Sequence, residues 1–228
     1  MAFRDDVRRI RAIVWKDLTT ERRSKAGFNS VASLGVTMLV LFGLALGPDS
    51  VALKDAAAGA LWLAVLFAGV LAFNRSYQVE LDGGALEALL LYPGSRWAIF
   101  AGKLIANLIF VTLMLVIVVG VGIVLFQVVV PPTWPAIVGI LLLGVLGIVS
   151  LGTFYAAMSS RSRAREVLLP LLLYPMLIPV LLASMIATKA LLFGDLMNEV
   201  GAWVRMLSAF DVIFLVATFF AFEYVIEV

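Results

Sequence analysis

Residues 78–103 form the one extended polar stretch in the middle of a very apolar sequence. A glycine pair at positions 83 and 84 interrupts the preceding segment, and Pro93 with the glycine after it ends the next turn. Between them, leucines recur at helical spacing while Glu87 lies on another face. The pattern predicts a short amphipathic helix over 78–96 at the membrane surface, with an apolar face for the bilayer edge and an acidic face for a partner in water. An ordinary loop with a chance helix is the alternative.

The chain contains neither cysteine nor histidine, and this excludes several kinds of chemistry. Without cysteine, no disulfide, thiolate nucleophile or zinc–thiolate site can form. Without histidine, the chain lacks the residue that most often serves as general base, metal ligand and axial haem ligand. A phosphate-binding loop is also absent, because Trp97 stands where glycine is needed and Leu104 follows the Gly-Lys pair. Intramembrane carboxylates are not paired mid-span, as an ion-coupled carrier would require. We therefore expect no enzyme and no metal site, with energy arriving from a docking partner.

Composition assigns the chain to the polytopic helical membrane proteins. Of its 228 residues, 63% are hydrophobic and 14% are charged, and mean hydropathy is +1.09. An all-α fold with six spans is predicted, at 28–46, 56–73, 99–130, 134–158, 167–188 and 207–225. The third segment exceeds the ~20 residues that a span needs, so it should tilt or extend beyond the lipid. In the last segment we place Asp211, Glu223 and Glu227 near the ends, where charge is tolerated.

The first 27 residues are basic and precede the six-span permease domain, residues 28–228. Apolar residues recur there at intervals of three or four while arginines take the other faces, which predicts an amphipathic helix on the inner membrane surface. The side chains assigned to this interfacial helix are Trp15, Lys16, Asp17, Arg22 and Arg23. A basic arm that only keeps the N-terminus inside is the alternative, and the two are compatible.

Lysine and arginine are distributed unevenly along the chain. The N-terminal arm, the 75–103 region and the 161–165 loop hold 14 of the 17 if they share one side, which leaves only Lys54, Lys189 and Arg205 opposite. The positive-inside rule then places both termini and segment 78–96 in the cytoplasm. We expect contact with membrane lipid and none with nucleic acid.

Small residues and prolines indicate how the spans pack. Alanines follow one face of the second span at i+4 intervals, Gly43 and Gly47 form a pair in the first, and glycines punctuate the fourth. The fifth span should be bent or broken, as a moving part or as a static kink, because each of its three prolines removes a helix hydrogen bond. They are Pro170, Pro175 and Pro179. The 189–205 connection is amphipathic enough for a short helix on the outer surface.

Several residues of segment 78–103 match the sequence motif E-x3-G-x-L-E-x-L-x3-P…G-K. They are Glu80, Gly84, Leu86, Glu87, Leu89, Pro93, Gly102 and Lys103. The pattern resembles the cytoplasmic coupling segment of type 2 ABC exporter permeases, and more narrowly the CcmB family of cytochrome c maturation. The Trp-Lys-Asp-Leu sequence at 15–18, the proline-rich span at 168–180, the length and the span count agree with that family, so the resemblance covers essentially the whole chain.

The resemblance implies a homodimeric permease of the bacterial inner membrane, bound to a cytoplasmic ATPase that resembles CcmA. CcmC- and CcmD-like membrane subunits would help to deliver haem to a CcmE-like periplasmic chaperone. The resemblance thus implies that haem is a transported or transiently bound ligand, that ATP is bound by the partner subunit, and that this chain binds no cofactor covalently. The residues implied in coupling to the ATPase are Glu80, Gly84, Leu86, Glu87, Leu89, Leu90 and Pro93. A permease for a drug, lipid or polysaccharide, and an assembly scaffold without a transport path, are the alternatives.

Overall fold

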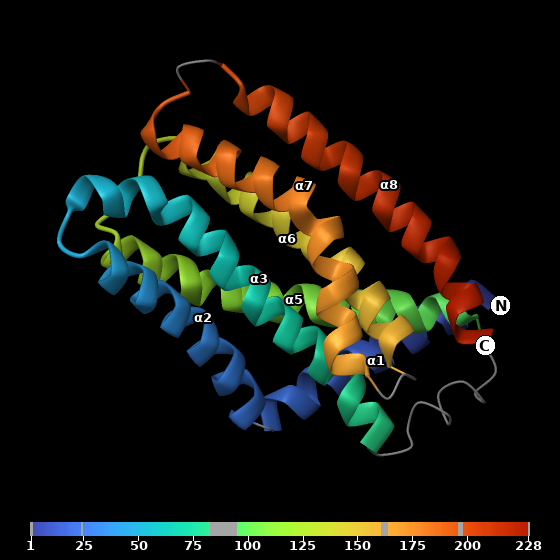
Figure 1. The fold of residues 1–228 in the computed structure, drawn as a ribbon. Helices are drawn as coiled ribbons and strands as arrows, with labels where there is room; N and C mark the ends of the chain where they lie inside the picture. Colours follow the sequence, from blue (N-terminus) through green and yellow to red (C-terminus); the bar gives the residue numbers. More distant parts are fainter. Residues whose placement is uncertain (1, 24, 83–94, 161–163, 196–197, 228) are drawn as a thin grey trace.

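The computed structural model describes residues 2–23, 25–82, 95–160, 164–195 and 198–227, which are helical and contain no strand. The helices are α1 (Ala2–Arg23), α2 (Lys25–Leu46), α3 (Ser50–Asp82), α5 (Arg96–Leu125), α6 (Trp134–Ser159), α7 (Arg165–Phe193) and α8 (Val200–Glu227) (Figure 1). All of them except α1 contain a segment long and apolar enough to cross a membrane, which makes 6 candidate spans. The predicted all-α fold with six spans is confirmed.

Polar caps and glycines set where the spans begin and end. Asp49 caps α3, because its carboxylate accepts hydrogen bonds from two backbone N–H groups at 2.9 and 3.3 Å. Asp195 caps α8 in the same way, at 2.8 and 3.1 Å. Gly47 and Gly194 follow α2 and α7 with φ of 67° and 107°, a backbone conformation that favours glycine.

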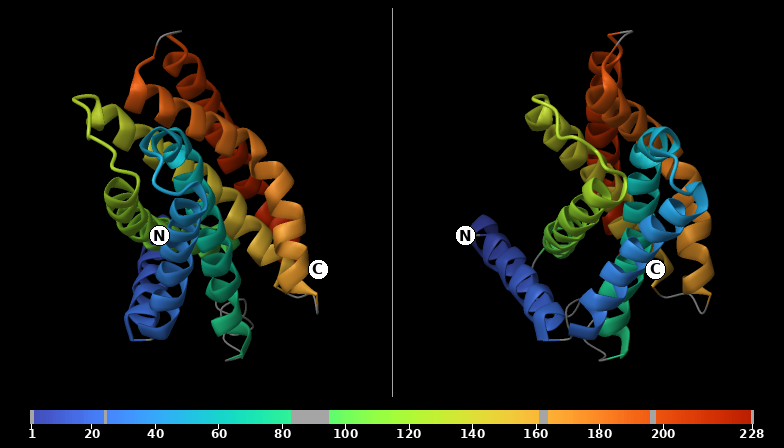
Figure 2. Two further views of the ribbon diagram at one scale, coloured as in Figure 1. Left: turned by 60° about the vertical axis from the view of Figure 1, so that its left-hand side comes forward. Right: turned by 90° about the vertical axis from the view of Figure 1, so that its left-hand side faces the viewer.

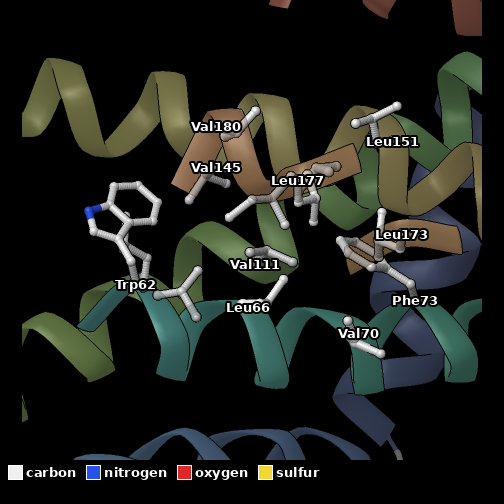
Figure 3. Close-up of a cluster of buried hydrophobic side chains, with 14 of the residues drawn as sticks. Trp62, Leu66, Val70, Phe73, Val111, Val145, Leu151, Leu173, Leu177 and Val180 are labelled. Carbon is white, nitrogen blue, oxygen red and sulfur yellow. The ribbon is translucent and has the colours of Figure 1, made fainter. Parts of the chain in front are cut away.

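The bundle is built around α6, which packs against α3, α5, α7 and α8. Helices α2 and α8 lie on opposite flanks, and α5 is inclined to its neighbours (Figure 1). Large apolar side chains from α3, α6 and α7 interdigitate at the centre, among them Trp62, Leu173 and Leu177, each at most 1% exposed (Figure 3). The core therefore lies between α3, α6 and α7.

Small residues allow these helices to approach closely. The predicted alanine stripe is buried at Ala60, Ala64, Ala68 and Ala72. On α6, a Cβ added at Gly144 would overlap the Trp62 ring, and one added at Gly152 would overlap the Phe73 ring. Close helix packing thus explains Gly144, Gly147 and Gly152 of the fourth span, whereas a Cβ at Gly139 would meet nothing within 4 Å.

Two predictions about the first and third spans are corrected. A Cβ at Gly43 or Gly47 would meet nothing within 4 Å, so this pair makes no packing contact within one chain. The third span ends at Leu125 rather than at position 130, because the chain turns at Phe126 and at Gln127, whose φ is 50°. The span still covers 29 residues, Trp97–Leu125. Figure 1 shows this helix inclined to its neighbours, and its tilt in a membrane stays a prediction.

The proline-rich fifth span is bent but not broken. α7 is one continuous helix from Arg165 to Phe193 with the three prolines inside it, and Figure 1 shows it bending partway along. Its buried face is formed by leucine, valine and alanine side chains, whereas Pro175 is exposed. The helix survives because packing against α6 holds the buried face in register.

The last span begins earlier than predicted. It covers Val200–Phe222 rather than 207–225, so Asp211 lies at its middle and not near an end. The Asp211 side chain is 3% exposed and faces Gly147 of α6, where an added Cβ would lie 2.8 Å from Oδ1. The described residues also contain no separate surface helix in the 189–205 connection, since α7 and α8 take up most of it. The apolar residues there extend the two spans instead.

The predicted surface helix over 78–96 overlaps the end of α3 and the first residue of α5. α3 runs through position 78 to Asp82, and α5 begins at Arg96. Residues 83–94, which carry the centre of the predicted helix, lie outside the described ranges. What the structure does describe are the two flanks of this segment.

Candidate functional site

The flank of residues 83–94 that leads into α5 is held by α1. Asp6 of α1 accepts hydrogen bonds from the hydroxyl and from the backbone N–H of Ser95, the second at 3.4 Å. Arg9, three residues later, donates to the Ser95 carbonyl at 3.2 Å. A helix distant in sequence thus caps α5, and the negative charge of Asp6 suits the positive end of the α5 dipole.

Lys103 joins α1, α3 and α5 at one point. Its side chain is 1% exposed, and its Nζ lies 3.0 Å from Asp17 Oδ2 of α1 and donates a hydrogen bond to the Ser76 carbonyl of α3 at 2.8 Å. The ammonium also lies 5.1 Å from the centre of the Tyr77 ring, within cation–π range. Because Asp17 Oδ2 accepts no well-aligned hydrogen bond, the Asp17 contact is an ion pair rather than a hydrogen bond. These groups together compensate for burying the charge.

Gly102 allows α1 to lie directly on α5. A Cβ at this position would come within 2.9 Å of the Ile13 side chain, which is itself 3% exposed. Glycine is therefore required by the close approach of the two helices. We use the name α1 clamp for Asp6, Arg9, Ile13 and Asp17 of α1 together with Ser76, Tyr77, Ser95, Gly102 and Lys103.

The residues predicted for the interfacial helix divide between two faces of α1. Asp17 turns inward to Lys103, and Lys16 lies 3.2 Å from the Asp17 carboxylate. Trp15 is 74% exposed, and Arg22 and Arg23 are exposed at the end of the helix. The right-hand view of Figure 2 shows α1 meeting α2 at an angle at one end of the bundle. The helix is confirmed, and its contact with lipid stays a prediction.

Most of the predicted coupling residues cannot be placed. Glu80 lies in the last turn of α3. Outside the described ranges are Gly84, Leu86, Glu87, Leu89, Leu90 and Pro93. The structure thus shows that α1, α3 and α5 are joined at Lys103 and that α1 also holds Ser95 directly after the segment, and the contacts of the segment itself stay a prediction.

Sequence reasoning missed most of the α1 clamp. It treated Lys103 as part of a pattern and as a topology-determining charge, and it assigned no role to Asp6 or Ser95. One signal was available, because Lys103 stands within the apolar run of residues 99–105. A lysine inside such a run requires a carboxylate partner. Nothing in the sequence identified Asp17 as that partner.

A polar hollow of about 140 Å³ lies beside the clamp, between α1, α3 and α5. Asp17, Glu21, Arg75 and Asn107 are among its lining residues. Partial burial raises the pKa of Glu21 above its usual value, and Asp17 raises it further while Arg75 opposes the shift. Glu21 and Arg75 approach each other at Gly27, where an added Cβ would overlap both side chains.

A second hollow, of about 410 Å³, lies where α1, α2 and α5 diverge. Its lining combines apolar side chains with polar groups at its rim: Leu18, Glu21, Arg22, Phe28, Asn29, Ile109, Phe110 and Leu113. We call it the α1–α2 groove. A third hollow, of about 230 Å³, lies at the opposite end of the bundle, and Thr188 is the one hydroxyl-bearing residue in its otherwise apolar lining. Among the described residues, no cluster of acidic side chains is suited to bind a metal ion.

Comparison with known proteins assigns this architecture to a family. The family described as CcmB protein matches residues 8–228, which include every described span. The chain belongs to the CcmB family. The protein named Heme exporter protein B of Rhodobacter capsulatus is 30% identical over 174 residues, which cover 76% of this chain and 79% of that one. The proteins of the same name from Haemophilus influenzae and Pseudomonas aeruginosa are each 29% identical and cover 75% of the chain and 76% and 77% of their own lengths. The resemblance to the CcmB family is confirmed.

Proposed function

We propose that this chain is the permease subunit of an ABC transporter that exports haem for the biogenesis of c-type cytochromes. The match to the CcmB family over residues 8–228 carries the proposal. The name of the relatives, Heme exporter protein B, is the reason for proposing haem as the substrate. The chain itself hydrolyses nothing. A partner ATPase that resembles CcmA binds and hydrolyses ATP on the cytoplasmic face of the inner membrane, where the charge bias places both termini.

Coupling occurs through segment 78–96. Its leucine face packs in a groove of the ATPase, and Glu87 meets a basic residue there. The α1 clamp supports this role, because Ser95 and Lys103 fix the flanks of the segment to α1 and α3. A displacement of residues 83–94 by the ATPase would therefore move α1, α3 and α5 together, since a buried ion pair and close packing resist separation.

Haem handling requires further subunits. In this proposal two copies of the permease act with CcmC- and CcmD-like membrane proteins, and haem passes to a CcmE-like periplasmic chaperone. Because the chain contains no histidine, any contact of its side chains with haem iron would use methionine or tyrosine. The bent α7, with Pro170, Pro175 and Pro179, is the helix we propose to move during the cycle.

The test is co-purification of the chain with its candidate ATPase and haem-handling subunits, together with an assay of c-type cytochrome maturation. We expect a stable complex, and maturation that depends on the chain. Glu87→Lys should leave the chain inserted in the membrane but uncouple ATP turnover from maturation, because the new lysine would repel the basic residue of the ATPase. Asp55→Lys is the matched control, since Asp55 is exposed at the opposite end of the bundle and its ion pair among the described residues is with the exposed Lys189 at 3.2 Å.

Three outcomes are decisive. Normal maturation in Glu87→Lys would contradict the coupling role. A complex with the ATPase alone, and normal cytochromes in cells lacking the chain, would favour a permease for a drug, lipid or polysaccharide. A complex that assembles without stimulating ATP turnover under any condition would favour a scaffold.

A further inference from the structure

The polar hollow and the α1–α2 groove adjoin. Leu18, Glu21 and Phe110 line both of them, so a molecule lying in the groove can extend a polar group into the hollow. The groove is lined by the end of α1, the start of α2 and part of α5. Figure 2 shows α1 and α2 diverging from where they meet, at one end of the bundle. Amphipathic helices of this kind lie at the depth of lipid headgroups.

The walls of the groove are apolar and open to the surroundings. Ile109 and Leu113 of α5 are 37% and 52% exposed, and Phe28 stacks edge-to-face on Phe110 at 5.8 Å. Such a surface fits the upper part of an acyl chain. At its rim, Arg22 and Asn29 are exposed polar side chains. The groove therefore has the polarity profile of a phospholipid, apolar along its length and polar at one end.

The polar hollow carries both signs of charge, and hydrogen-bonding atoms there are unused. Glu21 Oε1 and Arg75 Nε are buried and make no hydrogen bond among the described residues, whereas Asp17 Oδ2 beside them is already paired with the Lys103 ammonium at 3.0 Å. The Glu21 oxygen can accept a hydrogen bond, and the guanidinium nitrogen can donate one. Buried groups of this kind are normally satisfied by protein, water or a ligand.

We propose that the α1–α2 groove binds a zwitterionic aminophospholipid, with phosphatidylethanolamine as its representative. The ammonium group donates a hydrogen bond to the Glu21 carboxylate, the phosphate accepts from Arg75 and Arg22, and an acyl chain lies along Ile109 and Leu113. Charge complementarity selects this headgroup. An anionic lipid without an amine leaves Glu21 Oε1 without a donor, and a quaternary choline group has no N–H to donate.

This site does not depend on the identity of the transported substrate. It would fix the angle between α1 and α2 at the place where Glu21, Gly27 and Arg75 meet. Because α1 also forms the clamp, a bound lipid would stabilise the helix that holds the flanks of the coupling segment.

The experiment uses the purified, delipidated full-length chain in a neutral detergent. Binding of dioleoyl phosphatidylethanolamine, phosphatidylcholine and phosphatidylglycerol is compared by native mass spectrometry and by the shift in melting temperature. We expect phosphatidylethanolamine to bind most tightly. Glu21→Gln should weaken its binding about tenfold, the loss expected for one hydrogen bond between charged groups, and should leave phosphatidylcholine binding unchanged.

Two further variants complete the test. Leu113→Trp fills the groove from an exposed position and should abolish retention of all three lipids, whereas Asp55→Asn at the opposite end should change nothing. Equal affinity for the three lipids, or an unchanged preference in Glu21→Gln, would overturn the proposal. So would protection of Leu113 by a second copy or by another subunit in the purified complex, because a protein would then occupy the groove.

Discussion

At the scale of single residues, the buried ammonium of Lys103 is the most informative feature. One nitrogen contacts a carboxylate of α1, a carbonyl of α3 and an aromatic ring, although Lys103 itself belongs to α5. Its partners come from positions 17, 76 and 77, so no local sequence pattern could have assembled them. The sequence identified the lysine and the glycine before it, and only the fold shows that both serve the contact with α1.

The ion pair predicts a specific pattern of stability. Lys103→Met removes the buried cation of the pair and leaves Asp17 with only the more exposed Lys16 beside it, so the free energy of unfolding should fall by about 3 kcal/mol. The double variant Lys103→Met with Asp17→Leu removes both charges and should recover most of that loss. Denaturation of the purified protein in mixed detergent micelles measures both values. Equal losses in the single and the double variant would show that the pair is not the source of the effect.

Glu21 predicts a dependence of stability on pH. Because burial raises its pKa in the folded chain above the ordinary 4.5, the folded state holds the proton more tightly than the unfolded state does. The associated stability is fully present below pH 4.5 and is lost as pH rises through the raised value. In delipidated protein, Glu21→Gln should therefore show a smaller fall in melting temperature with rising pH. Asp5→Asn, which alters an exposed carboxyl of the same helix, should retain the wild-type fall.

At the scale of elements, hydropathy located the spans, and tertiary contacts corrected their ends. The presence of the second span, the alanine stripe and most of the packed fourth-span glycines could be predicted because they follow directly from length and helical spacing, although the second span covers Val51–Gln78 rather than 56–73 and Gly139 packs against nothing. The start of α8 could not be predicted, because it depends on Asp195. The Asp195 carboxylate caps the helix from the preceding turn, so residues 200–206 are helical. That shift moved Asp211 from the expected edge to the middle of the span.

Close packing of α6 gives a prediction with a built-in control. Gly144→Ala places a methyl group against the Trp62 ring, and overpacking of this kind costs about 1–3 kcal/mol. Gly139→Ala on the same helix adds a methyl group where nothing lies within 4 Å, so it should be neutral or gain up to about 1 kcal/mol from helix propensity. Thermal unfolding in detergent compares the two. A drop in stability for Gly139→Ala as large as that for Gly144→Ala would contradict the packing described for α6.

At the scale of the whole molecule, six spans and an angled N-terminal helix form one bundle whose charged end carries the α1 clamp. The CcmB family could be recognised from the sequence because its short motifs are continuous stretches, at residues 78–103 and in the proline-rich span. The arrangement of helices around α6 could not, since membrane spans of similar hydropathy do not reveal which of them are neighbours. The hollows next to α1 depend on that arrangement, so they could not be predicted from the sequence either.

Topology can be tested directly because the chain has no cysteine. Arg23→Cys marks the end of α1, and Val129→Cys marks the opposite end, where Val129 is 80% exposed. In cells with an intact inner membrane, a membrane-impermeant maleimide should label Val129→Cys and not Arg23→Cys, and both should react after permeabilisation. Labelling of Arg23→Cys alone in intact cells would invert the proposed orientation.

The central claim is that the segment between α3 and α5 is where a partner ATPase acts. The most direct measurement is site-specific photo-cross-linking in cells, with a photoreactive amino acid placed at position 86 or 87 and, as a control, at position 55. We expect an adduct with the ATPase from position 86 or 87 and none from position 55. An assembled complex that yields ATPase adducts only from position 55, or none from the segment, would contradict the account.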